Sequence, residues 1–204
     1  MEPQERILFK AHELFMRYGI RSVSMDEIAT QLGISKKTIY QYYADKDAIV
    51  DGVIGIEIAM NEKQCAEQKN NCENAVHEIF LATDVVQEML KAMNPAILFD
   101  LEKYHPDAFK KFNDHKQTFL YGVIKNNLER GIKDELYRPE INKEIICRFR
   151  IGSIFLIFNQ ELFPPTKTNI TDVLWETTAN FLYGLATTKG IKLIQKYKLQ
   201  RNKK

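Results

Sequence analysis

Apolar residues recur every three or four positions along nearly the whole chain, and this is the spacing of one face of an α-helix. Ile7, Ala11, Leu14 and Tyr18 form the first such face. No segment shows the alternation of apolar and polar residues between turn residues that is typical of strands. Because a helix buries its apolar face only by packing on other elements, the sequence predicts an all-α fold.

The N-terminal part of the chain carries start and stop signals for short helices. Gly19 is placed to end the first helix, because glycine accepts the left-handed conformation found at helix ends. Ser24 and Glu27 have the spacing of a capping box that opens a second helix, and Gly33 ends it. Ser35 then begins a third helix. Two short helices joined by a tight turn that contains glycine predict a helix-turn-helix.

The third helix should bury one face and expose the other. Ile39 and Tyr43 are four residues apart, so they share a face that packs on the first two helices. The remaining residues carry ammonium, hydroxyl and amide groups, which donate hydrogen bonds to phosphate oxygens and base edges. The alternative is an ordinary solvated helix face. Since residues 1–50 hold seven basic and seven acidic residues, affinity for DNA would come from a local patch and from doubling in a dimer.

The stretch from residue 5 to residue 50 resembles the DNA-binding domain of the tetracycline-repressor (TetR) family of bacterial regulators. The resemblance lies in "YG", "SMDEIA", "LGIS", "TIYQYY" and "DKD", which occur here in that order. It implies an all-helical two-fold dimer with an N-terminal helix-turn-helix domain (1–47) and a larger C-terminal domain (48–204) for ligand binding and dimerisation. It also implies binding to a pseudo-palindromic operator in double-stranded DNA, most often as a repressor released by a small effector.

The resemblance assigns roles to single positions of this chain. It implies contacts to base edges or the nearby backbone by Lys36, Lys37, Tyr40 and Gln41. It implies contacts to phosphates by Ser24, Thr38, Tyr42 and Lys46. Two positions depart from the family pattern: Lys37 stands where glycine is frequent, and Asp45 adds a negative charge beside Lys46.

Two sets of residues in the C-terminal domain are candidates for binding, and each has an alternative. Ligand pockets are mostly apolar with a few polar groups, so the candidate ligand residues are Phe80, Met89, Met93, Phe99, His115, Phe119 and Phe158. They could equally form the core of the bundle. The last two long helices are apolar over a broad arc, so the candidate dimer residues are Phe155, Phe158, Val173, Leu174, Phe181 and Leu185. The alternative for these is burial within one chain.

Other classes of protein fit the sequence less well. Cys65, Cys72 and Cys147 form no CxxC pair, and no histidine cluster has metal-ligand spacing, so we expect no metal and no cofactor. No signal peptide and no membrane span is recognisable, which predicts a cytoplasmic protein. No phosphate loop, GxGxxG or nucleophile motif occurs, so we expect that the protein is not an enzyme. A triad assembled from distant residues and a helical partner-binding protein that no longer binds DNA stay as alternatives.

Overall fold

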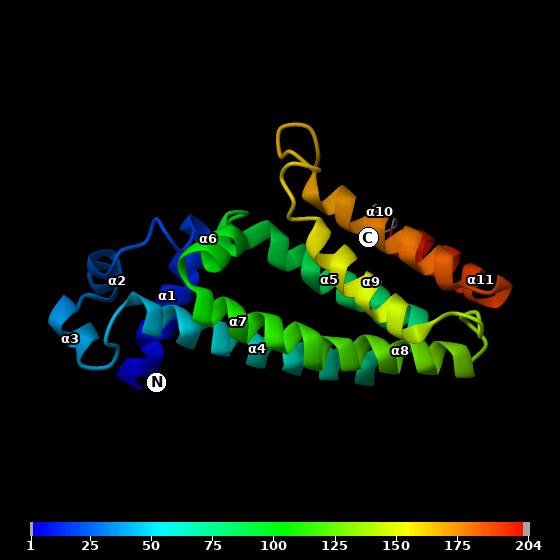
Figure 1. Ribbon diagram of the computed structural model, residues 1–204, viewed down its shortest axis with the longest axis horizontal. Helices are drawn as coiled ribbons and strands as arrows, with labels where there is room; N and C mark the ends of the chain where they lie inside the picture. The colour runs from blue at the N-terminus through cyan, green and yellow to red at the C-terminus, as the bar shows by residue number, and fades with distance from the viewer. Residues whose placement is uncertain (1, 202–204) are drawn as a thin grey trace. The chain divides into compact units, whose positions relative to one another are not determined.

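The computed structural model describes residues 2–201, and within them the regular elements are helices (Figure 1). An isolated antiparallel bridge joins Tyr137 and Ala186. The predicted all-α fold is confirmed. The elements are α1 (Pro3–Tyr18), α2 (Met25–Leu32), α3 (Lys36–Tyr40), α4 (Lys46–Asn71), α5 (Ala75–Ala92), α6 (Ile97–Tyr104), α7 (Pro106–His115), the π-helical turn η1 (Lys116–Leu120), α8 (Tyr121–Lys133), α9 (Lys143–Leu156), α10 (Ile170–Leu185) and α11 (Thr188–Arg201).

The predicted helix ends are confirmed by their hydrogen bonds. The Ser24 hydroxyl accepts the Glu27 N–H, and the Ser35 hydroxyl accepts the Thr38 N–H, each at 3.1 Å. These bonds satisfy backbone donors that have no partner inside a helix. Gly33 ends α2 in the left-handed region, with φ of 67°. The turn between α2 and α3 is therefore fixed by local chemistry.

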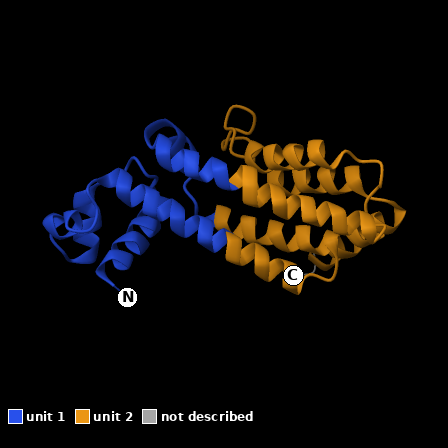
Figure 2. Cartoon of the chain, turned by 60° about the horizontal axis from the view of Figure 1, so that its bottom comes forward, with its two compact units in different colours: residues 1–61, 91–115 blue, residues 62–90, 116–204 orange. Residues whose placement is uncertain are grey.

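The chain forms two compact units, shown in different colours in Figure 2. Unit 1 comprises residues 1–61 and 91–115, and unit 2 comprises residues 62–90 and 116–204. Unit 1 therefore continues along α4 beyond the domain boundary predicted at residue 47, and it includes α6 and α7. The division into functional domains at residue 47 stays a prediction.

The core of unit 1 fixes the orientation of α3. Ile39 is fully buried and Tyr43 is 7% exposed, and both belong to one cluster with Phe15 and Ile28. The predicted buried face of the third helix is thus confirmed. The same cluster includes Leu101 from α6, so that helix packs with the helix-turn-helix.

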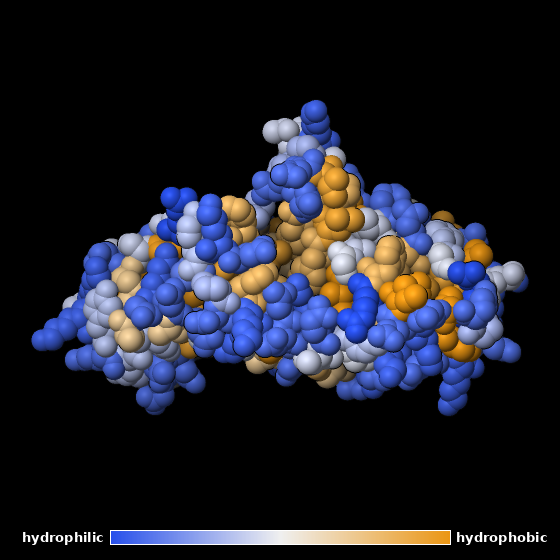
Figure 3. Space-filling model, in the orientation of Figure 1, coloured by the Kyte–Doolittle hydropathy of each residue, from blue (hydrophilic) through white to orange (hydrophobic). Residues whose placement is uncertain are grey.

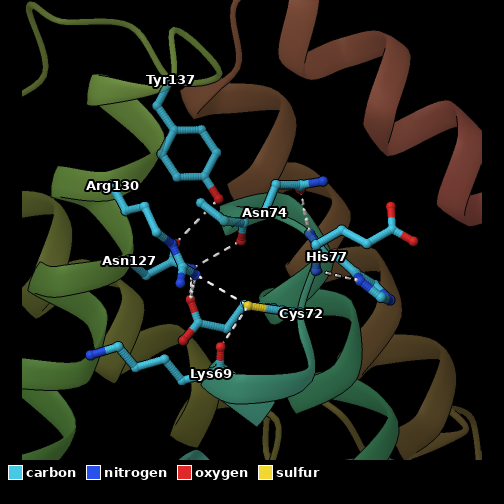
Figure 4. A network of polar contacts seen from close by, with 10 residues as sticks. Lys69, Cys72, Asn74, His77, Asn127, Arg130 and Tyr137 are labelled. Carbon is cyan, nitrogen blue, oxygen red and sulfur yellow. Dashed lines mark hydrogen bonds and ion pairs between the residues drawn. The ribbon is translucent and has the colours of Figure 1, made fainter.

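The core of unit 2 is built from α5, α8, α9, α10 and α11 together with the loop after α8. Tyr137 is fully buried, and its hydroxyl donates to the side-chain oxygen of Asn127 at 3.2 Å (Figure 4). The Asn127 amide donates to the carbonyl of Ala75 at 2.9 Å, and Glu78 forms an ion pair with Arg130. This network ties α5 to α8 through groups that are buried or partly buried, where satisfied polar contacts fix one arrangement.

Two predicted helices differ from the observed ones. The periodicity of residues 140–163 predicts one helix up to Pro164, but α9 ends at Leu156. The Asn159 side chain then accepts the N–H groups of Glu161 and Leu162 in a turn. The periodicity of residues 106–131 predicts one long helix, which the structure divides into α7 and α8 by the π-helical turn η1. Within residues 2–201, no helix combines the length and the apolar character needed to span a bilayer.

Candidate nucleic-acid interface

Helix α3 and the two residues that follow it present a row of polar side chains to solvent. Tyr40 and Tyr42 are 47% and 41% exposed, and Lys37 and Gln41 are also exposed. Burial of Ile39 on the opposite face holds this row outward. The row brings together two phenol hydroxyls, one ammonium group and one amide, so it offers several donors and acceptors on a small surface.

Lys36 has a partner that its sequence position does not suggest. Its ammonium nitrogen lies 2.8 Å from Asp26 Oδ2, on α2. This hydrogen bond raises the pKa of Lys36 above its ordinary value. The two residues are ten positions apart and lie on different helices, so no helical spacing indicated the pair. Any phosphate that binds Lys36 has to compete with this carboxylate.

Two further predicted contacts, Ser24 and Thr38, lie at helix starts. The Thr38 and Ser35 hydroxyl oxygens are 2.8 Å apart, so they share a hydrogen bond. Ser24 is exposed, and its oxygen accepts the Glu27 N–H while the hydroxyl proton stays available for another acceptor. Both side chains therefore support the local helix start, and their contact with phosphate stays a prediction.

Lys46 points into unit 1 rather than away from it. Its ammonium nitrogen donates to the carbonyl of Ile20 at 2.6 Å and lies 5.8 Å from the centre of the Phe15 ring. Partial burial lowers the pKa of Lys46. In this arrangement the ammonium group connects the start of α4 to the loop before α2. None of these contacts tests whether Lys46 also binds a phosphate, so that contact stays a prediction.

The α1–α2 loop is held by α6, which the sequence did not indicate. The buried carboxylate of Asp100 accepts the N–H of Arg21 at 2.9 Å, and the N–H of Asn94 donates to the carbonyl of Met16 at 2.7 Å. In the sequence, the one indication of such a role is that Asp100 is an acidic residue within the apolar run of residues 97–101. These bonds couple the position of α6 to the loop whose Ile20 carbonyl holds Lys46.

The predicted ligand residues are divided between the two units, and their role in ligand binding stays a prediction. Met93, Phe99 and His115 belong to unit 1, where Phe99 is 57% exposed and the His115 Nε2 lies 3.1 Å from the Asn61 side chain. Four others belong to unit 2: Phe80, Met89, Phe119 and Phe158. Of these, Phe80 lines a cavity of about 140 Å³. Its other lining residues are Trp175, Glu176, Thr178, Ala179, Leu182, Ile194, Lys198 and Arg201.

Half of the predicted dimer residues need correction. Leu174, Phe181 and Leu185 are 3%, 5% and 1% exposed, because their side chains form the core of unit 2. They are therefore unavailable to a second chain, and the alternative of burial within one chain holds for them. The other three, which are half-buried and keep part of their surface in solvent, are Phe155, Phe158 and Val173.

The exposed apolar surface lies instead along the opposite side of α9. Ile145, Phe149 and Leu156 are 62%, 59% and 40% exposed, and their spacing places them on one helix face. We call these three residues the α9 stripe. Figure 3 shows hydrophobic surface over α9 on the face drawn. The sequence pattern was too apolar all round to distinguish this face from the buried one.

Comparison with known proteins gives relatives of one kind. The family model described as "Bacterial regulatory proteins, tetR family" matches residues 7–53, which include most of α1 and all of α2 and α3. The helix-turn-helix-type transcriptional regulator YvaF of Bacillus subtilis is 26% identical over 180 residues, which are 88% of this chain and 93% of that protein. The similarity to YvaF thus extends well beyond the helix-turn-helix.

Solved structures agree with this fold at low sequence identity. A transcriptional regulator from Saccharomonospora viridis, determined in complex with choline, has a TM-score of 0.74 and 15% identity. A TetR-family regulator from Agrobacterium tumefaciens has the same TM-score and identity. Both comparisons cover 90% of this chain and 97% of the other chain. They show that nine tenths of this chain share the fold of these regulators.

Proposed function

Because the chain belongs to the TetR family of bacterial transcriptional regulators, we propose that it binds an operator through α3 and that a small ligand in unit 2 controls this binding. The single observation that carries the proposal is the exposed row of Lys37, Tyr40, Gln41 and Tyr42, held outward by the buried Ile39. In a helix-turn-helix, the second helix enters the major groove and its early residues reach base edges.

The proposed roles divide the row by reach and chemistry. Lys37 and Gln41 lie one turn apart and supply a cation and an amide, which suit guanine and adenine edges respectively. The Tyr40 hydroxyl contacts a base edge or the nearby DNA backbone. The Tyr42 hydroxyl, just beyond the end of α3, donates to a phosphate. Ser24 and Thr38 serve phosphates from helix starts. Selection of genomic fragments by the purified protein tests these roles: recovered sites should contain two related half-sites. Fragments without a shared sequence would contradict the proposal.

Asp26→Asn is expected to tighten DNA binding several-fold, because it removes the carboxylate that competes with DNA for Lys36. Where Lys36 reaches a phosphate, the slope of log affinity against log salt should also become steeper by about one unit per site. Fluorescence anisotropy with labelled operator at several salt concentrations measures both quantities. Weaker binding would instead show that Asp26 orients Lys36 for a base edge.

We propose further that the protein is a homodimer and that the α9 stripe lies in its interface. Three large apolar side chains on one face of a helix are typical of a surface that another chain covers. A two-fold dimer also presents two copies of α3 to the two half-sites of a palindrome. The corrected interface therefore replaces the buried residues with Ile145, Phe149 and Leu156.

Phe149→Glu is expected to weaken the dimer by about tenfold or more, because two carboxylates, one from each chain, would enter an apolar interface. Sedimentation velocity across a concentration series measures the dimer population. Leu199→Glu is the control, since Leu199 on α11 is 64% exposed and lies outside the stripe. Equal dimerisation of both variants would place the interface elsewhere.

The ligand-dependent part of the proposal is repression relieved by an effector. Support comes from the fold, because the S. viridis regulator of the same fold was solved with a small molecule, choline. Support also comes from the cavity of about 140 Å³ in unit 2, whose wall includes Phe80 and Trp175. Aromatic walls with a few polar groups are typical of small-molecule sites.

A further inference from the structure

Arg150 is a buried cation for which the described residues offer little compensation. It lies on the inward side of α9 and is 8% exposed. Within residues 2–201, its guanidinium makes one hydrogen bond, from Nη2 to the Thr178 hydroxyl, and the length of 3.4 Å makes it weak. The group also stacks over the Phe181 ring, with 4.7 Å between the guanidinium carbon and the ring centre.

A buried guanidinium normally has an acidic partner. It carries five N–H donors in a planar fork. Within residues 2–201, one long bond to a neutral hydroxyl is the hydrogen bond that this fork makes, and its other nitrogens are not fully removed from solvent. No carboxylate of the described residues forms an ion pair with Arg150, whereas Arg130 in the same unit is paired with Glu78. Burial lowers the pKa of Arg150 to about 10, so the group is still charged at neutral pH.

We propose that Arg150 binds the carboxylate of a small, otherwise apolar ligand inside unit 2. This inference rests on the proposed control of the protein by a ligand and specifies the class of that ligand. A carboxylate has the planar two-oxygen geometry that a guanidinium binds with two parallel hydrogen bonds. The single charge of a carboxylate also matches that of the Arg150 guanidinium.

Thr178 connects Arg150 to a place for the apolar part of the ligand. Its hydroxyl accepts from Arg150, and the same residue lines the cavity of about 140 Å³. Thr178 therefore borders both the guanidinium and the cavity whose walls include Phe80, Trp175 and Leu182. An aryl or alkyl group packs on these walls while its acid group reaches Arg150 once the Thr178 side chain turns.

The charge of Arg150 also selects against cations. A quaternary ammonium such as choline would place a second positive charge near a buried guanidinium, where the low dielectric strengthens the repulsion. Although the S. viridis regulator was solved with choline, this chain should bind a carboxylate in preference to choline. Choline is therefore a useful negative probe.

The test measures ligand binding by the whole chain of residues 1–204 without DNA. Phenylacetate, its neutral amide phenylacetamide, and choline are each titrated by calorimetry and by thermal unfolding. We expect phenylacetate to bind and raise the Tm, with an affinity roughly tenfold or more above that of phenylacetamide. Choline should leave the Tm unchanged. Because no DNA is present, failure here leaves the operator proposal untouched, and failure of DNA binding leaves this test valid.

Three variants separate ligand binding from a structural role. Arg150→Met keeps the packing on Phe181, so its Tm without ligand should equal or exceed that of the wild type while the response to phenylacetate is lost. Arg150→Lys should retain a weakened response. Arg148→Met, on the exposed side of the same helix, should respond like the wild type. A large loss of Tm in Arg150→Met, or equal binding of acid and amide by the wild type, would overturn the proposal.

Discussion

Gly131→Ala is expected to destabilise unit 2 by about 3 kcal/mol or more. A Cβ atom at Gly131 would lie 2.0 Å from Cδ2 of Tyr137, far inside van der Waals contact. The Tyr137 ring cannot move aside easily, because it is fully buried and its hydroxyl is bonded to Asn127 (Figure 4). The expected loss corresponds to a fall in Tm of roughly 6–12 °C for a chain of this size.

The matched control lies on the same helix. Gly122 also belongs to α8, and a Cβ there would meet no atom within 4 Å. Gly122→Ala should therefore raise the stability by up to about 1 kcal/mol, as expected for alanine in place of glycine in a helix. Thermal unfolding followed by circular dichroism measures both variants. A Tm of Gly131→Ala equal to that of Gly122→Ala would contradict the packing of Tyr137 described above.

Lys37→Glu is expected to reduce the affinity for operator DNA by about a hundredfold or more. Lys37 is exposed near the start of α3, where the proposed interface needs a cation. Losing a base or phosphate contact costs about 1–3 kcal/mol per site, and a dimer on a palindrome loses it twice. The new carboxylates would in addition face the phosphates of both half-sites.

The control for this variant keeps the same change in net charge. Lys63 on α4 has a side chain that is 79% exposed, and it pairs only loosely with Glu67 at 3.9 Å. Lys63→Glu should bind the operator within a few-fold of the wild type at physiological salt, because its charge lies outside the α3 row. Anisotropy titrations of the two variants against one operator give the comparison. A similar loss in both would mean that bulk charge, not α3, carries the binding.

The local architecture of the N-terminal region was predictable because short-range chemistry determines it. Ser24, Gly33 and Ser35 act on backbone groups within a few residues, so their spacing alone indicated where helices begin and end. The burial of Ile39 and Tyr43 followed from helical periodicity for the same reason. The same periodicity places the candidate DNA-binding residues of α3 on its exposed face.

The remaining features depend on contacts between residues far apart in the sequence. The pairing of Lys36 with Asp26 and of Lys46 with Ile20 arises from packing between different helices, which no single-helix pattern encodes. In unit 2, apolar residues surround α9 on several sides, so the sequence could not separate the α9 stripe from the core. For the same reason, the sequence does not indicate that Arg150 is buried in that core.

We propose that this protein binds a specific operator through α3. The most direct measurement is a gel-shift titration of the purified protein against DNA from upstream of its own gene, with unrelated DNA as competitor, at two salt concentrations. We expect a complex that survives the competitor and weakens as salt rises. A complex that the competitor abolishes, or no complex with this DNA or with any selected genomic fragment, would contradict it.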